Sequence, residues 1–470
     1  MQFFFFFFVS SLAGNLSQVQ FAYIEPHDLD ATHPLGRNVS EVYKGTTIAS
    51  RMALKILIVG AGVSGPALAM LLRNSNPLHN VTVVERSLSL RAQGQQIDLK
   101  NQAPYILRKM DLLDTIKSRC VNETGTEVVG PAGDQIAYFG AGASGERRPG
   151  MTSEHEIMRG DMVQIIYDAS IRQEAKLKGK LGKNGLNYVF GQTITALDQR
   201  SDGVHVTFSD DRTERYDLVV GADGQRSRTR RLAFGSEVSN AAFKSIGVHA
   251  AYFDMPRVEG EGTLAKAHLS PGRNIIVTRP SGRDITGVLL FTKKESPKIK
   301  QSYKEQPDRQ KEAFAEEFRD LDWQNERVLA GLQGATEFYA SELGQIKMKQ
   351  LHTGRVVLVG DAGYCASPFT GLGTNLSVMG AYILAGELTR QGNNITGALQ
   401  TYEAKMRPVI DECQRLPLLS IFFPSSRLGV WAVNTLIWMV SKLVPMFPTA
   451  QGEENYKRQI PEYPELNLSS

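Results

Sequence analysis

The fold is decided by residues Lys55–Glu85, which begin KILIVGAGVSGPALAMLL. Ile56–Val59 is a continuous apolar run, which is typical of a strand buried on both faces. Gly60, Gly62 and Gly65 follow directly in the spacing GxGxxG, and a leucine-rich helical pattern comes after them. The stretch therefore predicts a strand, a tight glycine turn and a helix, in that order.

A second predicted strand, Val81–Val84, ends at Glu85, which lies 20 residues after Gly65. At that place a carboxylate can accept hydrogen bonds from a ribose. The glycines allow a tight turn, a close approach of the backbone to a pyrophosphate, and close packing of the helix on the strand. The start of the helix favours the phosphate charge. Together these features predict a dinucleotide-binding unit.

The spacing GxGxxG occurs again at Gly140–Gly145. The residues that follow it, ERRPG, cannot open an amphipathic helix, and no second strand ending in an acid comes after them. We interpret this run as a flexible loop, so the sequence predicts one dinucleotide fold and not two.

Two later motifs repeat the logic of a strand followed by a turn and a helix. Asp217–Arg230 reads DLVVGADGQRSRTR, and Arg355–Asn375 contains a second apolar strand before Gly-Asp and a glycine-rich turn. A helix that starts after such a turn can receive an anion, and Asp361 at a strand end can accept from a ribityl or ribose hydroxyl. Each motif alone could be an ordinary junction, but the three in this order are specific.

In these motifs the chain resembles the FAD-dependent aromatic hydroxylases of the p-hydroxybenzoate hydroxylase type. Within that family it is most similar to the tetracycline-inactivating and fungal secondary-metabolite monooxygenases. The resemblance runs from Met52 to about Arg415, and the first two motifs fit fully. The third departs at Gly363 and Tyr364, where the family usually has Ala-His.

The resemblance implies an α/β fold: a Rossmann-like FAD-binding domain, an inserted antiparallel-sheet substrate domain, and C-terminal helices. It also implies FAD as cofactor and a flavin-contacting arginine, for which Arg159 is the candidate; a salt bridge at a helix start is the alternative for Arg159. The expected cofactor-binding residues are Gly60, Gly62, Gly65, Glu85, Arg86, Arg159, Asp223, Gly224, Asp361, Gly371, Leu372, Gly373 and Asn375.

These anchors divide the chain into five expected segments. Residues 1–51 are an extension ahead of a native start at Met52, because the apolar run Phe3–Val9 is short and no basic residue precedes it. A targeting segment is the alternative. The remaining segments are a first FAD-binding part (52–240), a substrate sheet (241–345), a second FAD-binding part (346–415) and a C-terminal helical segment (416–470).

The amino-acid composition restricts the class of protein, its partners and its location. The 470 residues are 42% hydrophobic and 22% charged, which indicates a globular protein of more than one domain. The net charge of +4 and the lack of a basic block argue against nucleic acid as a partner. The three cysteines form no CxxC, so we expect neither a disulfide framework nor a metal site, and a reducing, cytoplasmic location.

The activity expected from the resemblance is that of a monooxygenase. NADPH or NADH would bind transiently and reduce the flavin, and a C4a-hydroperoxyflavin would insert one oxygen atom from O2 into an aromatic or polyketide-like small molecule of secondary metabolism. No catalytic side chain is assigned. The alternatives are a halogenase or a prenyl-lipid reductase on the same scaffold, or a flavoprotein that binds a small molecule without turnover. No WxWxI halogenase signature is present.

The last feature is the apolar segment Leu428–Val444. Arg427, Asn434 and Ser441 recur every seven residues, which draws a polar stripe along a helix. A helix on protein or at a membrane surface needs such a stripe, whereas a spanning helix does not. We therefore expect a packed or interfacial helix, with peripheral membrane contact in the second case.

Overall fold

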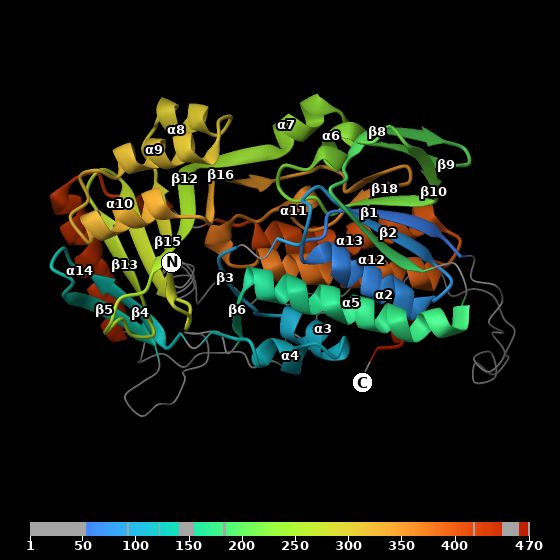
Figure 1. The fold of residues 1–470 in the computed structure, drawn as a ribbon, viewed down its shortest axis with the longest axis horizontal. Coiled ribbons are helices and arrows are strands. Elements are labelled where there is room, and N and C mark those ends of the chain that lie inside the picture. Colours follow the sequence, from blue (N-terminus) through green and yellow to red (C-terminus); the bar gives the residue numbers. More distant parts are fainter. Residues whose placement is uncertain are drawn as a thin grey trace, which may run out of the picture.

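The computed structural model describes residues 53–91, 94–121, 123–140, 155–181, 185–416, 419–443 and 460–468. They form two lobes that lie side by side along the long axis of the molecule (Figure 1). One lobe is built on a six-stranded sheet and the other on a seven-stranded sheet. The expected extension 1–51, and the second glycine run beyond Gly140, lie outside the described residues.

The six-stranded sheet contains the predicted dinucleotide-binding unit. Five strands are parallel, and the edge strand β17 is antiparallel to its neighbour. The central strand β1 has Ile58 level with Val220 on one side and with Val83 on the other. In spatial order the strands are β17 (His352–Thr353), β18 (Val356–Leu358), β11 (Leu218–Gly221), β1 (Lys55–Val59), β2 (Asn80–Glu85) and β7 (Leu186–Phe190).

Both faces of β1 are covered, which explains its unbroken apolar run. Ile56 and Ile58 pack against helices, whereas Leu57 and Val59 pack against a three-stranded sheet. No face of the strand meets water, so the alternation of a half-exposed strand is absent. The covering helices are α2 (Ser64–Ser75), α5 (Arg159–Leu181), α12 (Gly373–Gln391) and α13 (Ile395–Cys413).

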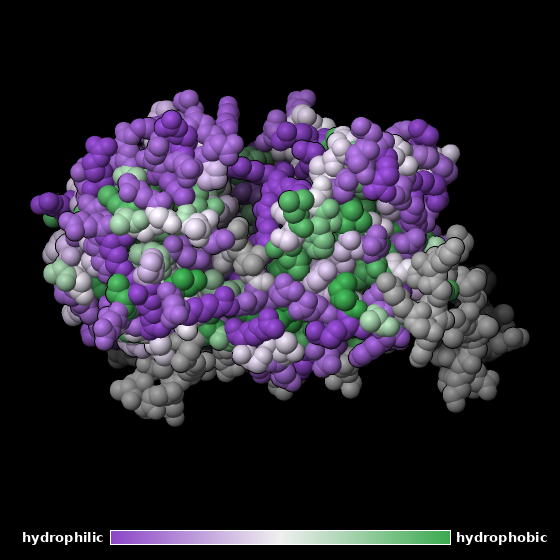
Figure 2. All heavy atoms as spheres, in the orientation of Figure 1, coloured by the Kyte–Doolittle hydropathy of each residue, from purple (hydrophilic) through white to green (hydrophobic). Residues whose placement is uncertain are grey.

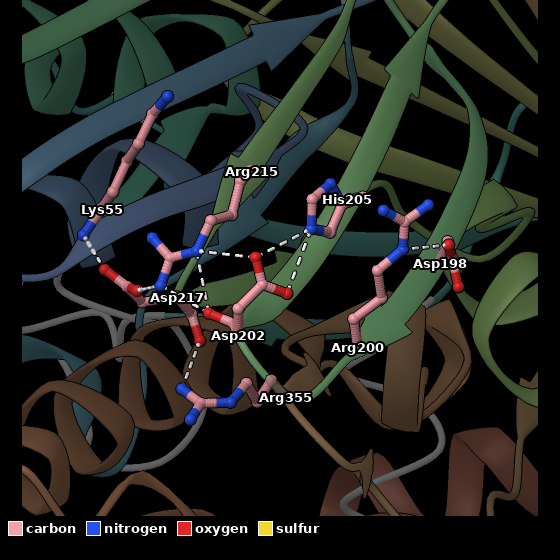
Figure 3. Close-up of polar contacts among 8 residues, drawn as sticks. All are labelled: Lys55, Asp198, Arg200, Asp202, His205, Arg215, Asp217 and Arg355. Atoms are coloured by element: carbon pink, nitrogen blue, oxygen red, sulfur yellow. Dashed lines mark hydrogen bonds and ion pairs between the residues drawn. The ribbon is translucent and has the colours of Figure 1, made fainter.

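Asp217 fastens the three-stranded sheet to the six-stranded one (Figure 3). Its carboxylate accepts from the backbone N–H of Lys55 at 2.8 Å and from the Arg215 guanidinium at 2.7 Å. Its carbonyl oxygen accepts from Arg355 at 3.2 Å. One residue thereby joins strands from three parts of the chain. The strands of the smaller sheet are β8 (Ile194–Arg200), β9 (Gly203–Phe208) and β10 (Thr213–Tyr216).

The second lobe contains the predicted inserted sheet. All its neighbouring strands are antiparallel except β13 and β4, which run parallel. Two of its strands, β4 and β5, come from the part of the chain before the insertion. In spatial order the strands are β16 (Phe338–Ile346), β12 (Phe243–Pro256), β15 (Ile285–Thr292), β14 (Asn274–Pro280), β13 (Leu264–Ser270), β4 (Gly125–Val129) and β5 (Gln135–Gly140).

Different elements cover the two faces of this sheet. On one face lie α8 (Pro297–Ser302), α9 (Pro307–Glu317) and α10 (Asn325–Gly334), and Phe314, Phe318 and Leu321 pack into the core beneath them. The core on the other face includes Phe369, which comes from the third motif. The third motif therefore contacts both lobes. Figure 2 shows a mostly hydrophilic surface that is hollowed between the lobes in this view.

Short elements complete the described chain and connect the larger ones. They are β3 (Gln96–Asp98), β6 (Glu156–Met158), α3 (Ala103–Lys109), α4 (Leu113–Lys117), α6 (Arg228–Phe234), α7 (Ser236–Ala242), α11 (Asp361–Tyr364), η2 (Pro368–Thr370), η3 (Leu419–Phe422) and η5 (Pro464–Leu466). The paired strands β3 and β6 lie between the two lobes (Figure 1).

Helix α14 (Arg427–Leu443) packs against β5 and β13 through Val433 and Ile437. Within the described residues, no helix has the length and apolarity to cross a bilayer. Of the predicted polar stripe, Arg427 is exposed, whereas Asn434 and Ser441 are half-buried. The exposed hydrophobic side chains of the helix are Leu428, Trp431, Trp438, Met439 and Leu443.

We expect Gly65→Ala to lower the free energy of unfolding by about 1–3 kcal/mol, the usual cost of overpacking. A Cβ on Gly65 would lie 2.0 Å from the carbonyl oxygen of Gly60, a backbone atom that cannot rotate away. Denaturant unfolding measures the loss. The matched control is Gly262→Ala, because a Cβ at Gly262 meets nothing within 4 Å. Equal stability of the two variants would show that α2 can shift without cost.

Candidate functional site

The three sequence motifs meet at one edge of the six-stranded sheet. β1, β11 and β18 are adjacent and parallel, so their carboxyl ends lie side by side. The turns that follow them touch: a Cβ on Gly60 would lie 2.5 Å from the Ala222 oxygen, and one on Gly360 would lie 2.5 Å from Ser64 Oγ. In open α/β sheets, the crevice at this edge is where ligands bind.

The first glycine turn allows a phosphate group to approach the backbone closely. Gly60 has φ 112°, which residues with a side chain rarely adopt, and its N–H donates to the Val84 carbonyl at 2.7 Å. Helix α2 begins four residues later at Ser64, and its first turn contains no acidic residue. The positive end of the helix dipole is therefore available to an anion.

Glu85 lies beside this turn at the end of β2. Its Oε2 accepts from the Ala61 N–H at 3.0 Å, and its Oε1 accepts from the Ser87 N–H at 3.1 Å. These bonds hold the carboxylate in place, and the remaining lone pairs can serve ribose hydroxyls. The exposed Arg86 follows, and burial together with the charge of Arg86 lowers the pKa of Arg91.

Asp223 is bonded within its own turn. Its Oδ1 accepts from the Ser227 hydroxyl, and its Oδ2 accepts from the backbone N–H groups of Arg228 (2.8 Å) and Thr229 (2.9 Å). The carboxylate thus satisfies N–H groups at the start of α6, and Gly224 with φ 78° turns the chain ahead of it. Direct contact of Asp223 and Gly224 with a cofactor stays a prediction.

Arg230, the last residue of the second motif, joins that motif to the third. It is buried, and its Nη1 donates to the Ala362 carbonyl at 2.7 Å while its Nη2 donates to the Gln225 carbonyl at 2.8 Å. Burial lowers the pKa of Arg230. This side chain fixes the position of the turn that carries Asp361.

Asp361 and Arg159 lie near each other on the wall of the crevice. Solvent reaches the Asp361 side chain, but protein lies close around it. This combination is expected of a residue that lines a groove. The surrounding protein raises the pKa of Asp361, and the charge of Arg159 opposes that shift. The Arg159 guanidinium also reaches the first glycine turn, because its Nη2 would lie 3.7 Å from a Cβ on Gly62.

The turn Gly371–Gly373 places the start of α12 next to Asp361. Gly371 has φ 68°, Leu372 is buried, and a Cβ on Gly373 would lie 3.8 Å from the Asp361 carboxylate. Asn375 is bonded inside the protein: its Oδ1 accepts from the Ala103 N–H at 2.8 Å, and its amide donates to Gln102 at 3.0 Å. Asn375 therefore holds α3 against the start of α12.

The departure from the family motif at Tyr364 lies in the protein core. Tyr364 is 1% exposed, and its hydroxyl lies 2.9 Å from that of Tyr402. Gly380 makes room for it, since a Cβ there would lie 1.9 Å from the Tyr364 hydroxyl oxygen. The tyrosine ring packs between helices and does not occupy the crevice, so the departure leaves the groove itself open.

A small cavity of about 40 Å³ lies where the two lobes meet. Gln95, Gln96 and Arg279 supply its polar wall, and Pro368 and Phe369 of the third motif also line it. The remaining lining residues are Val277, Leu289 and Phe291. The space is smaller than a small-molecule site usually requires, so a ligand would have to part the lobes here.

Charged groups are buried behind the polar wall. Arg279 donates from Nε and Nη2 to the two oxygens of Glu123 (3.1 and 2.9 Å) and also pairs with Glu156. Burial raises the pKa of Glu156 to about 8, against the lowering effect of Arg279, and the charges of Asp98 and Glu123 add to the rise. The cluster was not foreseen from the sequence, because its members are separate in the chain and match no motif.

A larger cavity of about 430 Å³ lies between the six-stranded and three-stranded sheets. None of the predicted cofactor residues lines it. Its charged residues pair with each other, as Lys55 and Glu214 do at 2.9 Å. This cavity therefore lies apart from the predicted cofactor residues.

The crevice fits a phosphate-containing dinucleotide. The backbone can approach a phosphate closely at Gly60 and Gly65, where a Cβ would fill the space. No acidic residue balances the positive end of the dipole at the start of α2. The carboxylates of Glu85 and Asp361 stand at separate places along the groove. Comparison with protein families agrees, since residues 53–416 match the FAD binding domain family.

Similar proteins point the same way. A FAD-dependent monooxygenase, asL6 from Sarocladium schorii, is 39% identical over 425 residues, which cover 89% of this chain and 100% of the relative. The flavin-dependent monooxygenase eupH from a Phoma species is 33% identical and covers 82% of this chain and 91% of its own. The crystal structure of tetracycline destructase Tet(51) superposes with a TM-score of 0.67 at 27% identity, covering 85% of this chain and 100% of its own.

Proposed function

Because the chain belongs to the FAD-dependent monooxygenases of the p-hydroxybenzoate hydroxylase type, we propose that it transfers one oxygen atom from O2 to an aromatic or polyketide-like small molecule. FAD is its cofactor. The proposed reductant is NADPH or NADH, and the proposed setting is secondary metabolism. Bound FAD would supply the oxygen chemistry through its C4a position.

One observation carries the proposal: Arg159 stands between the crevice and the cavity. Its guanidinium reaches Gly62 in the crevice, and its backbone N–H donates to the carbonyl of Gln95, which lines the cavity, at 3.2 Å. The third motif also contributes to both places, with Asp361 in the crevice and Phe369 in the cavity wall. A flavin held in the crevice would therefore present its ring to the cavity.

The chain's own residues have distinct proposed roles. Glu85 would hold the adenosine ribose, the start of α2 the pyrophosphate, and Asp361 the ribityl chain. Arg159 would lie at the flavin ring and stabilise the negative charge that develops on reduction. The apolar side chains of the cavity, such as Phe291 and Phe369, would exclude water from the reacting atoms.

The proposed activity predicts that the purified protein has a flavin absorbance spectrum and consumes NAD(P)H in an oxygen-dependent manner. An aromatic substrate should stimulate the consumption and yield a product heavier by one oxygen atom, as detected by mass spectrometry. Bound flavin without turnover against a broad aromatic panel would instead favour a flavoprotein that only binds its ligand.

The role assignments predict different responses of three variants to added FAD. Glu85→Ala should retain FAD poorly, because each lost hydrogen bond to the charged group weakens the free energy of FAD binding by about 1.5–3 kcal/mol. Excess FAD should restore its rate, because the loss is in binding alone. Asp361→Ala should behave in the same way. Arg159→Ala should stay slow in flavin reduction, or release more peroxide, at saturating FAD.

The measurement is a titration of the rate against FAD concentration for each variant. Arg200→Ala is the matched control for a lost arginine, since Arg200 is exposed on the three-stranded sheet and pairs only with Asp198 among the described residues. Full rescue of Arg159→Ala by FAD, with Glu85→Ala remaining inactive, would reverse the assignment and make Arg159 a structural ion-pair residue.

We also propose that the outer face of α14 contacts an anionic membrane surface. Trp431 is 65% exposed and Trp438 48% exposed on that face. Tryptophan favours the interface between lipid and water. Residues 427–443 contain Arg427 and Lys442 but no acidic residue, so the charge of the helix complements anionic lipid.

The double variant Trp431→Ser/Trp438→Ser should lose co-sedimentation with phosphatidylglycerol vesicles, because the apolar contact is removed. Leu88→Ser is the control, since Leu88 is 90% exposed but lies in the other lobe. The alternative is that a second copy of the chain covers this face. Light scattering on the same variants tests it, because it measures whether the protein is a dimer. A dimer that the double variant abolishes, without vesicle binding by the unmodified protein, would assign the face to a second copy of the chain.

A further inference from the structure

We propose that the cavity between the lobes selects a neutral oxygen-bearing substrate and excludes carboxylates, because the positive charge of Arg279 is already balanced within the protein. The inference rests on the proposed function, since it takes this cavity as the substrate site. It narrows the substrate class to phenols, enols, ketones or amides that bear no ionised acid.

The guanidinium of Arg279 has N–H groups that are hydrogen-bonded within the protein and others that are not. Its Nε and Nη2 are taken up by Glu123, and Nη2 also serves Glu156. Among the described residues, none accepts a hydrogen bond from its Nη1. Because Arg279 lines the cavity, the Nη1 hydrogens are the donors that an incoming ligand can use.

The charges around Arg279 leave no positive surplus. Asp98 and Glu156 are directly opposite each other in the β3–β6 pair, and Glu123 completes a set of three acids. Against them stand Arg279 and Lys100, whose ammonium lies 3.3 Å from Asp98. Two cations therefore face three carboxyl groups, and the cluster is neutral when Glu156 is protonated and negative when it is not.

An incoming carboxylate would gain little from this cluster. It would lose its hydration and then meet a guanidinium that two acids already neutralise, so the cost of desolvation would not be offset. A neutral carbonyl or hydroxyl oxygen can accept from Nη1 without adding a charge. The remaining lining, which includes Val277, Leu289 and Phe291, suits the apolar body of such a molecule.

The unmodified holoenzyme gives the first test. Two probes of the same shape, 3,4-dihydroxybenzamide and 3,4-dihydroxybenzoate, are titrated while the flavin absorbance is followed. The amide should bind at least about tenfold more tightly than the acid. Equal or tighter binding of the acid would overturn the inference, and so would the failure of both probes to bind at millimolar concentration.

The second test removes the two acids that balance the charge of Arg279. Either acid alone could hold the guanidinium, so both are replaced in the variant Glu123→Gln/Glu156→Gln, which keeps the shape and leaves one acceptor oxygen on each side chain. The affinity for the acid should rise about tenfold relative to that for the amide. The control is Glu261→Gln, which breaks an ion pair with Arg327 (3.0 Å) outside the cavity and should leave the ratio unchanged.

The outcomes separate this inference from the proposed function. A protein that binds no FAD, or that consumes no NAD(P)H with oxygen, contradicts the function whatever the probes do. A working flavoenzyme that prefers the acid contradicts the charge argument alone. If the double variant does not fold, the preference of the unmodified enzyme still decides.

Discussion

The contact on which the rest of the structure depends lies between the start of α2 and the end of β1. Gly65 is so close to the Gly60 carbonyl that no side chain fits between them. This proximity directs the start of the helix toward the carboxyl edge of the sheet, next to the turns after β11 and β18. Every group proposed to hold the cofactor is placed relative to that edge, so a shift of α2 would change the whole crevice.

Two arginines, the buried Arg230 and the half-buried Arg279, connect this arrangement to the rest of the molecule. Arg230 bonds to the carbonyl of Ala362 and so positions the turn that carries Asp361. Arg279 of the second lobe bonds to Glu123 and Glu156, which precede β4 and begin β6. The first arginine keeps the crevice in shape, and the second joins the inserted sheet to the strands between the lobes. Arginine can make such connections because the guanidinium donates in several fixed directions at once.

Several residues have tertiary contacts that the sequence pattern around them does not indicate. Asp223 matches a cofactor motif, yet its carboxylate satisfies N–H groups at the start of α6. Tyr364 departs from the motif, yet its ring is buried against Tyr402 and away from the crevice. Asn434 and Ser441 of α14 are half-buried, because the sheet beneath the helix selects the side that presents Val433 and Ile437. In each case packing partners that are distant in the chain decide where the side chain points.

The sequence by itself determined the strand–glycine–helix unit and the order of the three motifs, and it predicted residues for the crevice, because these depend on local spacing. A glycine is required where the backbone must approach, and an acid is required where a hydroxyl must be held. Only the tertiary structure decided that β4 and β5 join the inserted sheet, and that Glu123, Glu156 and Arg279 meet at the cavity. Those contacts join segments more than 100 residues apart, as Glu156 and Arg279 are. The burial of these acids and the balance of their charges arise only when both lobes are assembled, so no local sequence pattern can predict them.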